Sequence, residues 1–214
     1  IGVSGRCACA YPTPFWSLRK LDVSAHARAI RVVVPGFHSR YHGDMTQILI
    51  EPADPLGPAA GHLVQEMVAE IPPRYGEVLD AAAAAERAAA VLAANAAFLD
   101  TRSVFLLAVA GDQAIGCGGI QPIAVEDDQE TDTLIGEVKR MYVVEDWRRR
   151  GVGAAILAAL EARARVLGYR RLVLETGDRQ PEAVALYAAG GWLRIAPFGP
   201  YVDDPTSVCF EKWL

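Results

Sequence analysis

The sequence is poor in cysteine and in long apolar runs. Its 214 residues include 4 cysteines, and Cys7 and Cys9 stand too close together to begin a secreted disulfide framework. We find no apolar run near the roughly 20 residues of a membrane-spanning helix, and no signal-peptide pattern. These absences predict a cytoplasmic protein that makes no contact with a membrane.

Positive charge is also scarce. The chain has 21 Lys and Arg against 26 Asp and Glu, and residues 1–44 hold six of the basic and two of the acidic residues, so the rest is clearly acidic. A protein that binds nucleic acid through its phosphates presents a basic surface. The composition therefore argues against a nucleic-acid partner.

We place a domain boundary at Met45. Residues 1–44 scatter Pro, Gly, His and Arg around a single apolar run, 30–34, and their cysteines and histidines match no zinc pattern. We interpret 1–44 as an N-terminal extension outside the catalytic domain, with a docking arm as the alternative. Residues 45–214 are expected to form one domain, with no metal.

Hydrophobic periodicity predicts an α+β domain from Met45 onward. The strand–helix–strand succession that ends near residue 175 implies one parallel strand pair, whereas the turn 111–113 joins an antiparallel hairpin. The final strands form an edge that could pair with a second copy, a possible homodimer. Strands are expected over 47–51, 103–110, 114–123, 134–144, 171–175, 192–195 and 207–212, and helices over 60–71, 79–98, 151–167 and 181–189.

A short loop, Arg148-Arg149-Arg150-Gly151-Val152-Gly153, joins a predicted strand to a predicted helix. The start of a helix presents unpaired N–H groups and partial positive charge, and glycine leaves them accessible to an anion. Ile156 stands where a dinucleotide fingerprint has its third glycine, and no Gly-Lys-Ser/Thr follows. The remaining pattern is Arg/Gln-x-x-Gly-x-Gly/Ala.

This loop and its neighbours resemble the GNAT superfamily of N-acetyltransferases over about residues 45–214. Glu137-Val138-Lys139-Arg140-Met141-Tyr142-Val143 resembles the family strand that pairs with the pantetheine arm of acetyl-CoA. Gln180-x-x-Ala183-x-x-Leu186-Tyr187-x-x-x-Gly191-Trp192 is similar to the family's Asn-x-x-Ala-x-x-Leu-Tyr-x-x-x-Gly-Phe. Two residues depart from the pattern: Gln180 replaces the usual Asn, and Glu145 replaces a common Pro.

The resemblance implies a GNAT-like mixed, mostly antiparallel sheet flanked by helices, in which the parallel strand pair splays at the acetyl-CoA site. Acetyl-CoA would be the co-substrate. The residues expected to contact it are Met141, Tyr142, Val143, Arg148, Arg149, Arg150, Gly151, Val152, Gly153, Ala154, Thr176 and Gln180.

The implied reaction is direct transfer of the acetyl group to a primary amine, on a small molecule or a peptide. By resemblance, Tyr187 is the general acid that protonates the departing thiolate; its alternative is a core tyrosine beside Leu186 and Trp192. Glu137 is the candidate base, acting directly or through a water, and its alternative is an exposed carboxylate paired with Lys139.

The cysteines and several acidic residues each have two possible interpretations, and so does the function as a whole. Cys117 and Cys209 fall within predicted strands and are expected to be buried thiols, so we favour direct transfer over a covalent acyl-enzyme. Glu70, Glu77 and the acidic loop 126–132 would attract a cationic amine, or are ordinary surface residues. The alternative function is a non-catalytic acyl-CoA-binding module.

Overall fold

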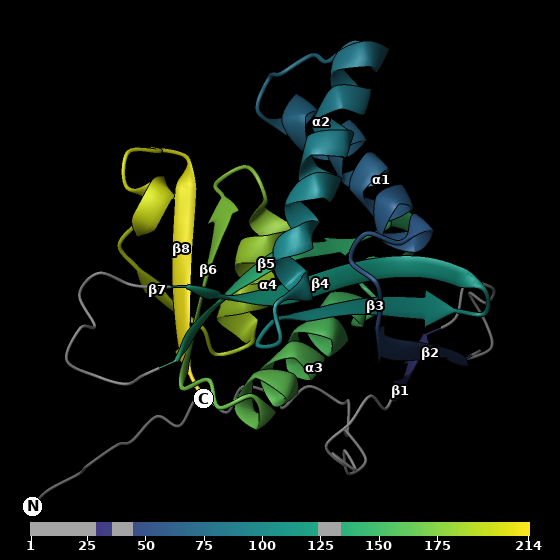
Figure 1. Cartoon of the computed structure of the whole chain (residues 1–214), viewed down its shortest axis with the longest axis vertical. Helices are drawn as coiled ribbons and strands as arrows, with labels where there is room; N and C mark the ends of the chain where they lie inside the picture. The colour runs from purple at the N-terminus through teal and green to yellow at the C-terminus, as the bar shows by residue number, and fades with distance from the viewer. Residues whose placement is uncertain (1–28, 36–44, 124–133) are drawn as a thin grey trace, which may run out of the picture.

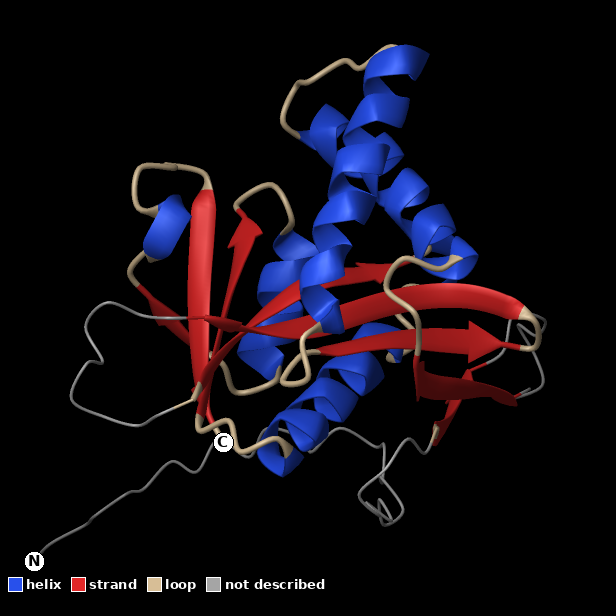
Figure 2. Ribbon diagram, viewed as in Figure 1, coloured by secondary structure: helices blue, strands red, loops and turns tan. Residues whose placement is uncertain are grey.

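The computed structural model describes residues 29–35, 45–123 and 134–214. Eight strands in the described residues form a single sheet in the order β1-β2-β3-β4-β5-β6-β8-β7 (Figures 1 and 2). The strands are β1 (Ile30–Pro35), β2 (Met45–Pro52), β3 (Val104–Ala110), β4 (Gln113–Ile123), β5 (Ile135–Val143), β6 (Arg171–Gly177), β7 (Leu193–Ile195) and β8 (Ser207–Trp213). The helices are α1 (Pro58–Arg74), α2 (Ala81–Ala94), α3 (Val152–Val166) and α4 (Pro181–Ala189), with 3-10 turns η1 (Asn95–Leu99), η2 (Glu145–Trp147) and η3 (Gly199–Tyr201).

The sheet is mixed, and its single parallel pair among the described strands is β5–β6. Their register joins Ile135–Val138 to Arg171–Leu174 only, although the two strands continue to Val143 and Gly177. Beyond Val138 the strands therefore splay apart. The predicted mixed, mostly antiparallel sheet with a splayed parallel pair is confirmed.

Two neighbouring glycines of β4 show how the helices cover the sheet. A Cβ on Gly118 would lie 2.9 Å from Ile156 on α3, whereas a Cβ on Gly119 would lie 2.3 Å from Phe98 in η1. Because successive side chains of a strand point to opposite faces, α3 covers one face and the α1–α2–η1 segment covers the other. Both helical layers approach the sheet closely because β4 carries no side chain at these positions.

The start of each flanking helix follows from local sequence. Pro58 and Pro181 stand at the first positions of α1 and α4, where a missing N–H costs nothing. The Asp80 side chain accepts a hydrogen bond from the Ala83 amide, 2.8 Å away, and so caps α2. The predicted helix 79–98 is divided at Asn95 into α2 and η1.

The alanine-rich segment that includes α2 corrects one of our expectations. By length and composition alone, Ala81–Leu99 is apolar enough to cross a membrane, although we found no such run in the sequence. Such a helix is weak evidence by itself. Within its apolar 18-residue window, 17% of the residues are buried, and the segment contacts the rest of the protein through residues such as Ala88 and Phe98.

Strand β1 lies within the segment that we separated from the catalytic domain. Ile30–Pro35 pairs with β2 in antiparallel register, and Val34 is 3% exposed within the core. Residues 30–35 therefore belong to the folded sheet, and the boundary at Met45 does not mark its edge. That residues 1–44 take no part in catalysis stays a prediction, because 1–28 and 36–44 lie outside the described residues. The acidic loop 126–132 also lies outside them.

Candidate functional site

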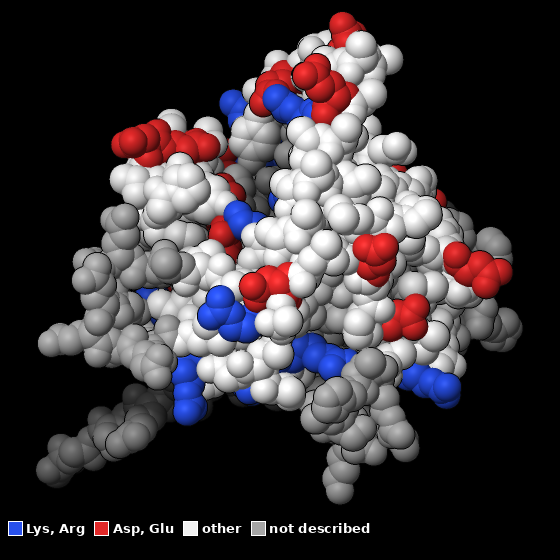
Figure 3. Space-filling model, viewed as in Figure 1, with Lys and Arg blue, Asp and Glu red and all other residues white. Residues whose placement is uncertain are grey.

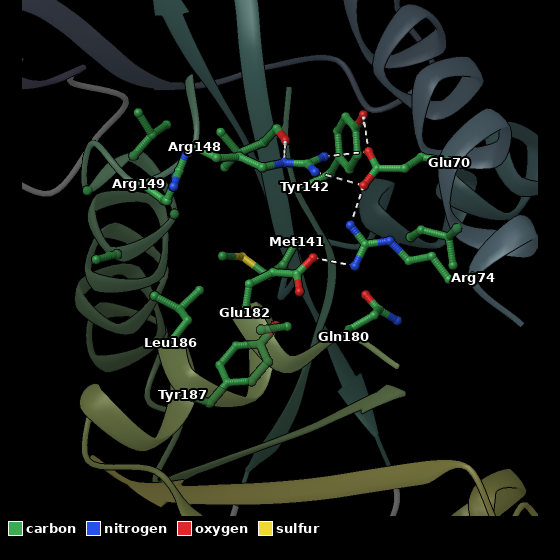
Figure 4. A pocket seen from close by; sticks show the side chains of 17 residues that line it. Glu70, Arg74, Met141, Tyr142, Arg148, Arg149, Gln180, Glu182, Leu186 and Tyr187 are labelled. Atoms are coloured by element: carbon green, nitrogen blue, oxygen red, sulfur yellow. Dashed lines mark hydrogen bonds and ion pairs between the residues drawn. The ribbon is translucent and has the colours of Figure 1, made fainter. Parts of the chain in front are cut away.

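A cavity of about 420 Å³ lies at the C-terminal end of β5, between α1, the β5–α3 loop and α4 (Figure 4). It is therefore built from segments far apart in the sequence. The residues that line it are Glu70, Ile71, Arg74, Met141, Tyr142, Val143, Arg148, Arg149, Gly151, Val152, Gly153, Ala154, Gln180, Glu182, Ala183, Leu186 and Tyr187.

The β5–α3 loop turns its backbone toward this cavity. Arg149 and Gly151 adopt left-handed φ values of 59° and 85°, and Gly151 is the N-cap of α3. The first hydrogen bond of the helix runs from the Ala155 amide to the Gly151 carbonyl, 2.9 Å away. The amides of residues 152–154 precede this bond, so they have no partner within the helix and suit an anion.

Glu70 gathers the charged side chains on one wall of the cavity. Arg148 Nη1 donates to Glu70 Oε1 at 2.7 Å and Arg148 Nη2 donates to Oε2, while Arg74 Nη2 donates to Oε1 at 2.6 Å. Tyr142 Oη adds a bond to Oε2 at 3.1 Å, and Arg74 also pairs with Glu182 on α4. The hydrogen bonds from Arg148, with those from Arg74 and Tyr142, lower the pKa of Glu70 to about 2 despite its partial burial.

Tyr187 reaches the cavity from α4. It is 4% exposed, and its ring lies 6.0 Å from that of Trp192 and 5.7 Å from that of Phe210, between centroids. Burial raises the pKa of its hydroxyl, and the nearby Glu175 carboxylate raises it further. The hydroxyl is therefore protonated at neutral pH, as a proton donor must be.

Glu137 does not line this cavity. The residue is 6% exposed on β5, where Tyr201 Oη donates to its Oε1 at 2.8 Å and Lys139 Nζ lies 2.7 Å from the same oxygen. Lys139 Nζ also donates to Tyr201 Oη at 2.7 Å, which closes a three-membered cluster. The pairing with Lys139 that we considered is present, but the carboxylate is buried, not exposed.

A second carboxylate lies on the same face of the sheet. Glu175 on β6 comes directly after Leu174, the last β6 residue that pairs with β5, and it accepts a hydrogen bond from Ser207 Oγ at 2.8 Å. Burial raises its pKa. Tyr201 lies in η3, between β7 and β8, and Ser207 is the first residue of β8, so this part of the chain reaches both carboxylates.

The structure thus brings together most of the residues predicted to bind the cofactor. Two do not line the cavity: Arg150 places its guanidinium 5.3 Å from the Trp147 ring centroid, and Thr176 is buried opposite Val208 of β8. The others are Met141, Tyr142, Val143, Arg148, Arg149, Gly151, Val152, Gly153, Ala154 and Gln180, and all of these line it.

Sequence reasoning missed the contribution of α1. Glu70 was considered only as an acidic residue that attracts an amine, and Arg74 was not considered. Their spacing of four residues predicts an ion pair on one helix, which is present at 2.6 Å. Nothing in that spacing indicates that the pair faces Arg148, because that contact depends on how α1 packs across the sheet.

The cysteines agree with the expectation of buried thiols. Cys117 and Cys209 are 3% and 1% exposed, and burial raises the pKa of Cys117 to about 12. A thiol with that pKa is a poor nucleophile at neutral pH. Among the described residues, no group of three His, Cys, Asp or Glu side chains is arranged to hold a metal ion.

The charged side chains on the face drawn in Figure 3 are mixed in sign. Lys and Arg are separated there by acidic and neutral side chains over the described part of the surface.

Comparison with known proteins identifies the family. Residues 65–192 match the family model "Acetyltransferase (GNAT) family". The IAA acetyltransferase of Azospirillum brasilense is 40% identical over 110 residues, which are 51% of this chain and 67% of the relative. The N-acetyltransferase YsnE of Bacillus subtilis is 36% identical over 106 residues, 49% of this chain and 65% of the relative.

Solved structures agree on the fold. The structure of yncA from Salmonella typhimurium with its cofactor acetyl-CoA superposes with a TM-score of 0.57 over 78% of this chain and 94% of that one. At 16% identity this likeness concerns the fold alone. The family match over residues 65–192 shows that the chain belongs to the GNAT family of acetyltransferases and is by family an acyltransferase, and the splayed β5–β6 pair agrees with this.

Proposed function

We propose that the protein transfers an acetyl group from acetyl-CoA to a primary amine by direct attack of the amine on the thioester. The observation that carries this proposal is a single cavity with the unpaired amides of α3 at one wall and Tyr187 at another. The first suits a diphosphate, and the second suits a leaving thiolate.

Donor binding would use backbone groups on two sides. The amides of residues 152–154 would hold the diphosphate at the start of α3, where the helix dipole favours negative charge. The edge of β5 that faces the splay has no parallel partner beyond Val138, so the pantetheine arm would pair with Met141–Val143 as another strand would.

The acceptor must lose a proton before or during attack. An alkylamine with a pKa near 10.4 is neutral in fewer than about one molecule in 10³ at pH 7. We assign Glu137 as the base, directly or through a water. Its bonds to Tyr201 and Lys139 hold the carboxylate in one orientation, and proton transfer would need a path from this cluster to the amine.

Tyr187 would complete the transfer. As the tetrahedral intermediate collapses, the carbon–sulfur bond breaks and the Tyr187 hydroxyl gives its proton to the departing thiolate sulfur. A backbone N–H of β5 near Val143 would stabilise the negative oxygen of the intermediate. The Tyr187 hydroxyl keeps its proton across the neutral range, which the role requires, whereas the burial that raises its pKa also makes it a weaker acid.

The acceptor is proposed as a class: a primary amine on a small molecule or on a peptide. The name of the Azospirillum brasilense relative adds IAA to the compounds worth testing. The rival function is a module that binds acyl-CoA without turnover.

One experiment separates these functions. Acetyl-CoA is titrated into the protein by calorimetry, and release of free thiol is then followed across a panel of primary amines and, in a separate reaction, with IAA. Binding followed by amine-dependent thiol release supports the enzyme. Binding without release on any amine favours the module, and absence of binding contradicts both.

A further inference from the structure

Glu70, Arg74 and Arg148 form the charged wall of the cavity. One contact in this wall is not explained by the proposed binding of acetyl-CoA. Arg148 stands at the first position of the Arg/Gln-x-x-Gly-x-Gly/Ala pattern, yet its guanidinium points at α1 (Figure 4). Its Nε donates to the Val143 carbonyl at 2.8 Å, and both terminal nitrogens donate to Glu70. Three of the five N–H groups of this guanidinium are therefore already bonded within the protein.

Glu70 is the matching centre on α1. Its two oxygens accept four hydrogen bonds, from Arg148, Arg74 and Tyr142. Charge-assisted and bidentate bonds of this kind are the strongest in proteins. An incoming diphosphate would have to break the fork between Arg148 and Glu70 to reach this guanidinium.

The residues immediately after Arg148 adopt a costly conformation. Arg149 has a left-handed φ of 59°, which residues with a Cβ rarely adopt, and Gly151 follows at 85°. This turn directs the amides of residues 152–154 toward the cavity. A strained turn persists only when its surroundings hold it, and the bonds of Arg148 to Glu70 and Val143 lie directly before it.

We propose that Glu70 is a positioning residue for donor binding: through Arg148 it holds the turn at Arg149–Gly151, and the diphosphate is bound by the amides that this turn presents rather than by the Arg148 guanidinium. The inference rests on the proposed function, since it assumes that acetyl-CoA occupies this cavity. It assigns α1 a part in binding the donor.

The test is a double-mutant cycle with Glu70→Met, Arg148→Met and the double variant, with the dissociation constant of acetyl-CoA measured by calorimetry. Each single variant is expected to weaken binding roughly tenfold, as loss of a charge-assisted hydrogen bond commonly does. The double variant should lie within about twofold of either single variant, because both remove the same clamp.

The opposite result distinguishes a direct phosphate contact. If Arg148 binds the diphosphate itself, Glu70→Met frees its guanidinium, so binding is unchanged or tighter. Arg148→Met would then weaken binding at least as much without Glu70 as with it. Either outcome overturns the proposal.

Kinetics add a measurement that general loss of stability would not mimic. A positioning role predicts a higher KM for acetyl-CoA with kcat and the KM for the amine unchanged. Glu211→Met is the matched control, because Glu211 is a partly buried carboxylate that pairs with Arg171 at 2.8 Å and does not line the cavity. If Glu70→Met does not fold, Glu70→Gln keeps the shape and is expected to shift binding in the same direction by a smaller factor.

Failure of the two proposals would look different. Wild-type protein that does not bind acetyl-CoA contradicts the proposed function. Wild-type protein that binds it, with Glu70 variants that bind equally well, contradicts only the positioning role.

Discussion

Replacing Tyr187 by Phe removes one oxygen and leaves the ring in place. The ring packs 6.0 Å from Trp192 and 5.7 Å from Phe210, and the variant keeps both contacts. Stability should therefore change by about 1 kcal/mol or less, the usual net contribution of one hydrogen bond. If the hydroxyl protonates the thiolate, kcat under saturating acetyl-CoA falls by about 10²–10⁴, the usual contribution of a general acid.

The pKa of Tyr187 sharpens this prediction. Burial and the Glu175 carboxylate raise that pKa above its ordinary value, so the wild-type rate should not fall between about pH 7 and 9 through loss of this proton. Tyr169→Phe is the matched control. Tyr169 is 2% exposed, and its hydroxyl donates to the Arg102 carbonyl at 2.8 Å, away from the cavity. This control should lose about 1 kcal/mol of stability and keep its kcat. A kcat of Tyr187→Phe within about twofold of wild type would refute the acid role.

Three further predictions concern stability. The folded pKa of Glu70, about 2, lies below its ordinary 4.5, so the ionised carboxylate contributes its full stabilisation above pH 4.5 and loses it as the pH falls toward 2. The difference in unfolding free energy between wild type and Glu70→Gln, measured in urea, should be at most about 3 kcal/mol near pH 7 and should narrow near pH 3. A difference that stays constant with pH would contradict this linkage. Gly119→Ala would place a Cβ 2.3 Å from Phe98, so thermal unfolding should reveal a loss of about 1–3 kcal/mol, and an unchanged midpoint would mean that the ring moves freely. Removing residues 1–29 should leave the melting temperature unchanged, as our extension hypothesis requires. Removing residues 1–44 also deletes β1 with its buried Val34, so this deletion should lower the melting temperature. Equal melting temperatures for the two deletions would argue against a stabilising role for β1.

The parts of the site that the sequence predicted are local in origin. A glycine at the N-cap and free amides in the first turn of a helix depend on a few consecutive residues, so the loop at Gly151 was recognisable without its surroundings. The helix that carries Tyr187 was predicted with its observed bounds, 181–189, because Pro181 and Gly190-Gly191 mark its ends.

Other features depended on contacts between distant segments. We assigned strand β1 to the extension because the sequence does not reveal which strand a single apolar run will pair with. In the sheet, β1 pairs with β2. Glu137 meets Tyr201 across 64 positions of sequence, and Glu70 meets Arg148 across 78.

The sequence by itself determined which segment presents amides to an anion and which helix presents a tyrosine, because backbone geometry and helix ends follow from neighbouring residues. Only the tertiary structure decided what each charged side chain contacts. Arg148 illustrates the difference: its position in the motif suggested a phosphate, and the packing of α1 across the sheet gave it a carboxylate instead. A guanidinium bonds to whichever acceptor the fold places within reach, and that choice is not encoded in its neighbours along the chain.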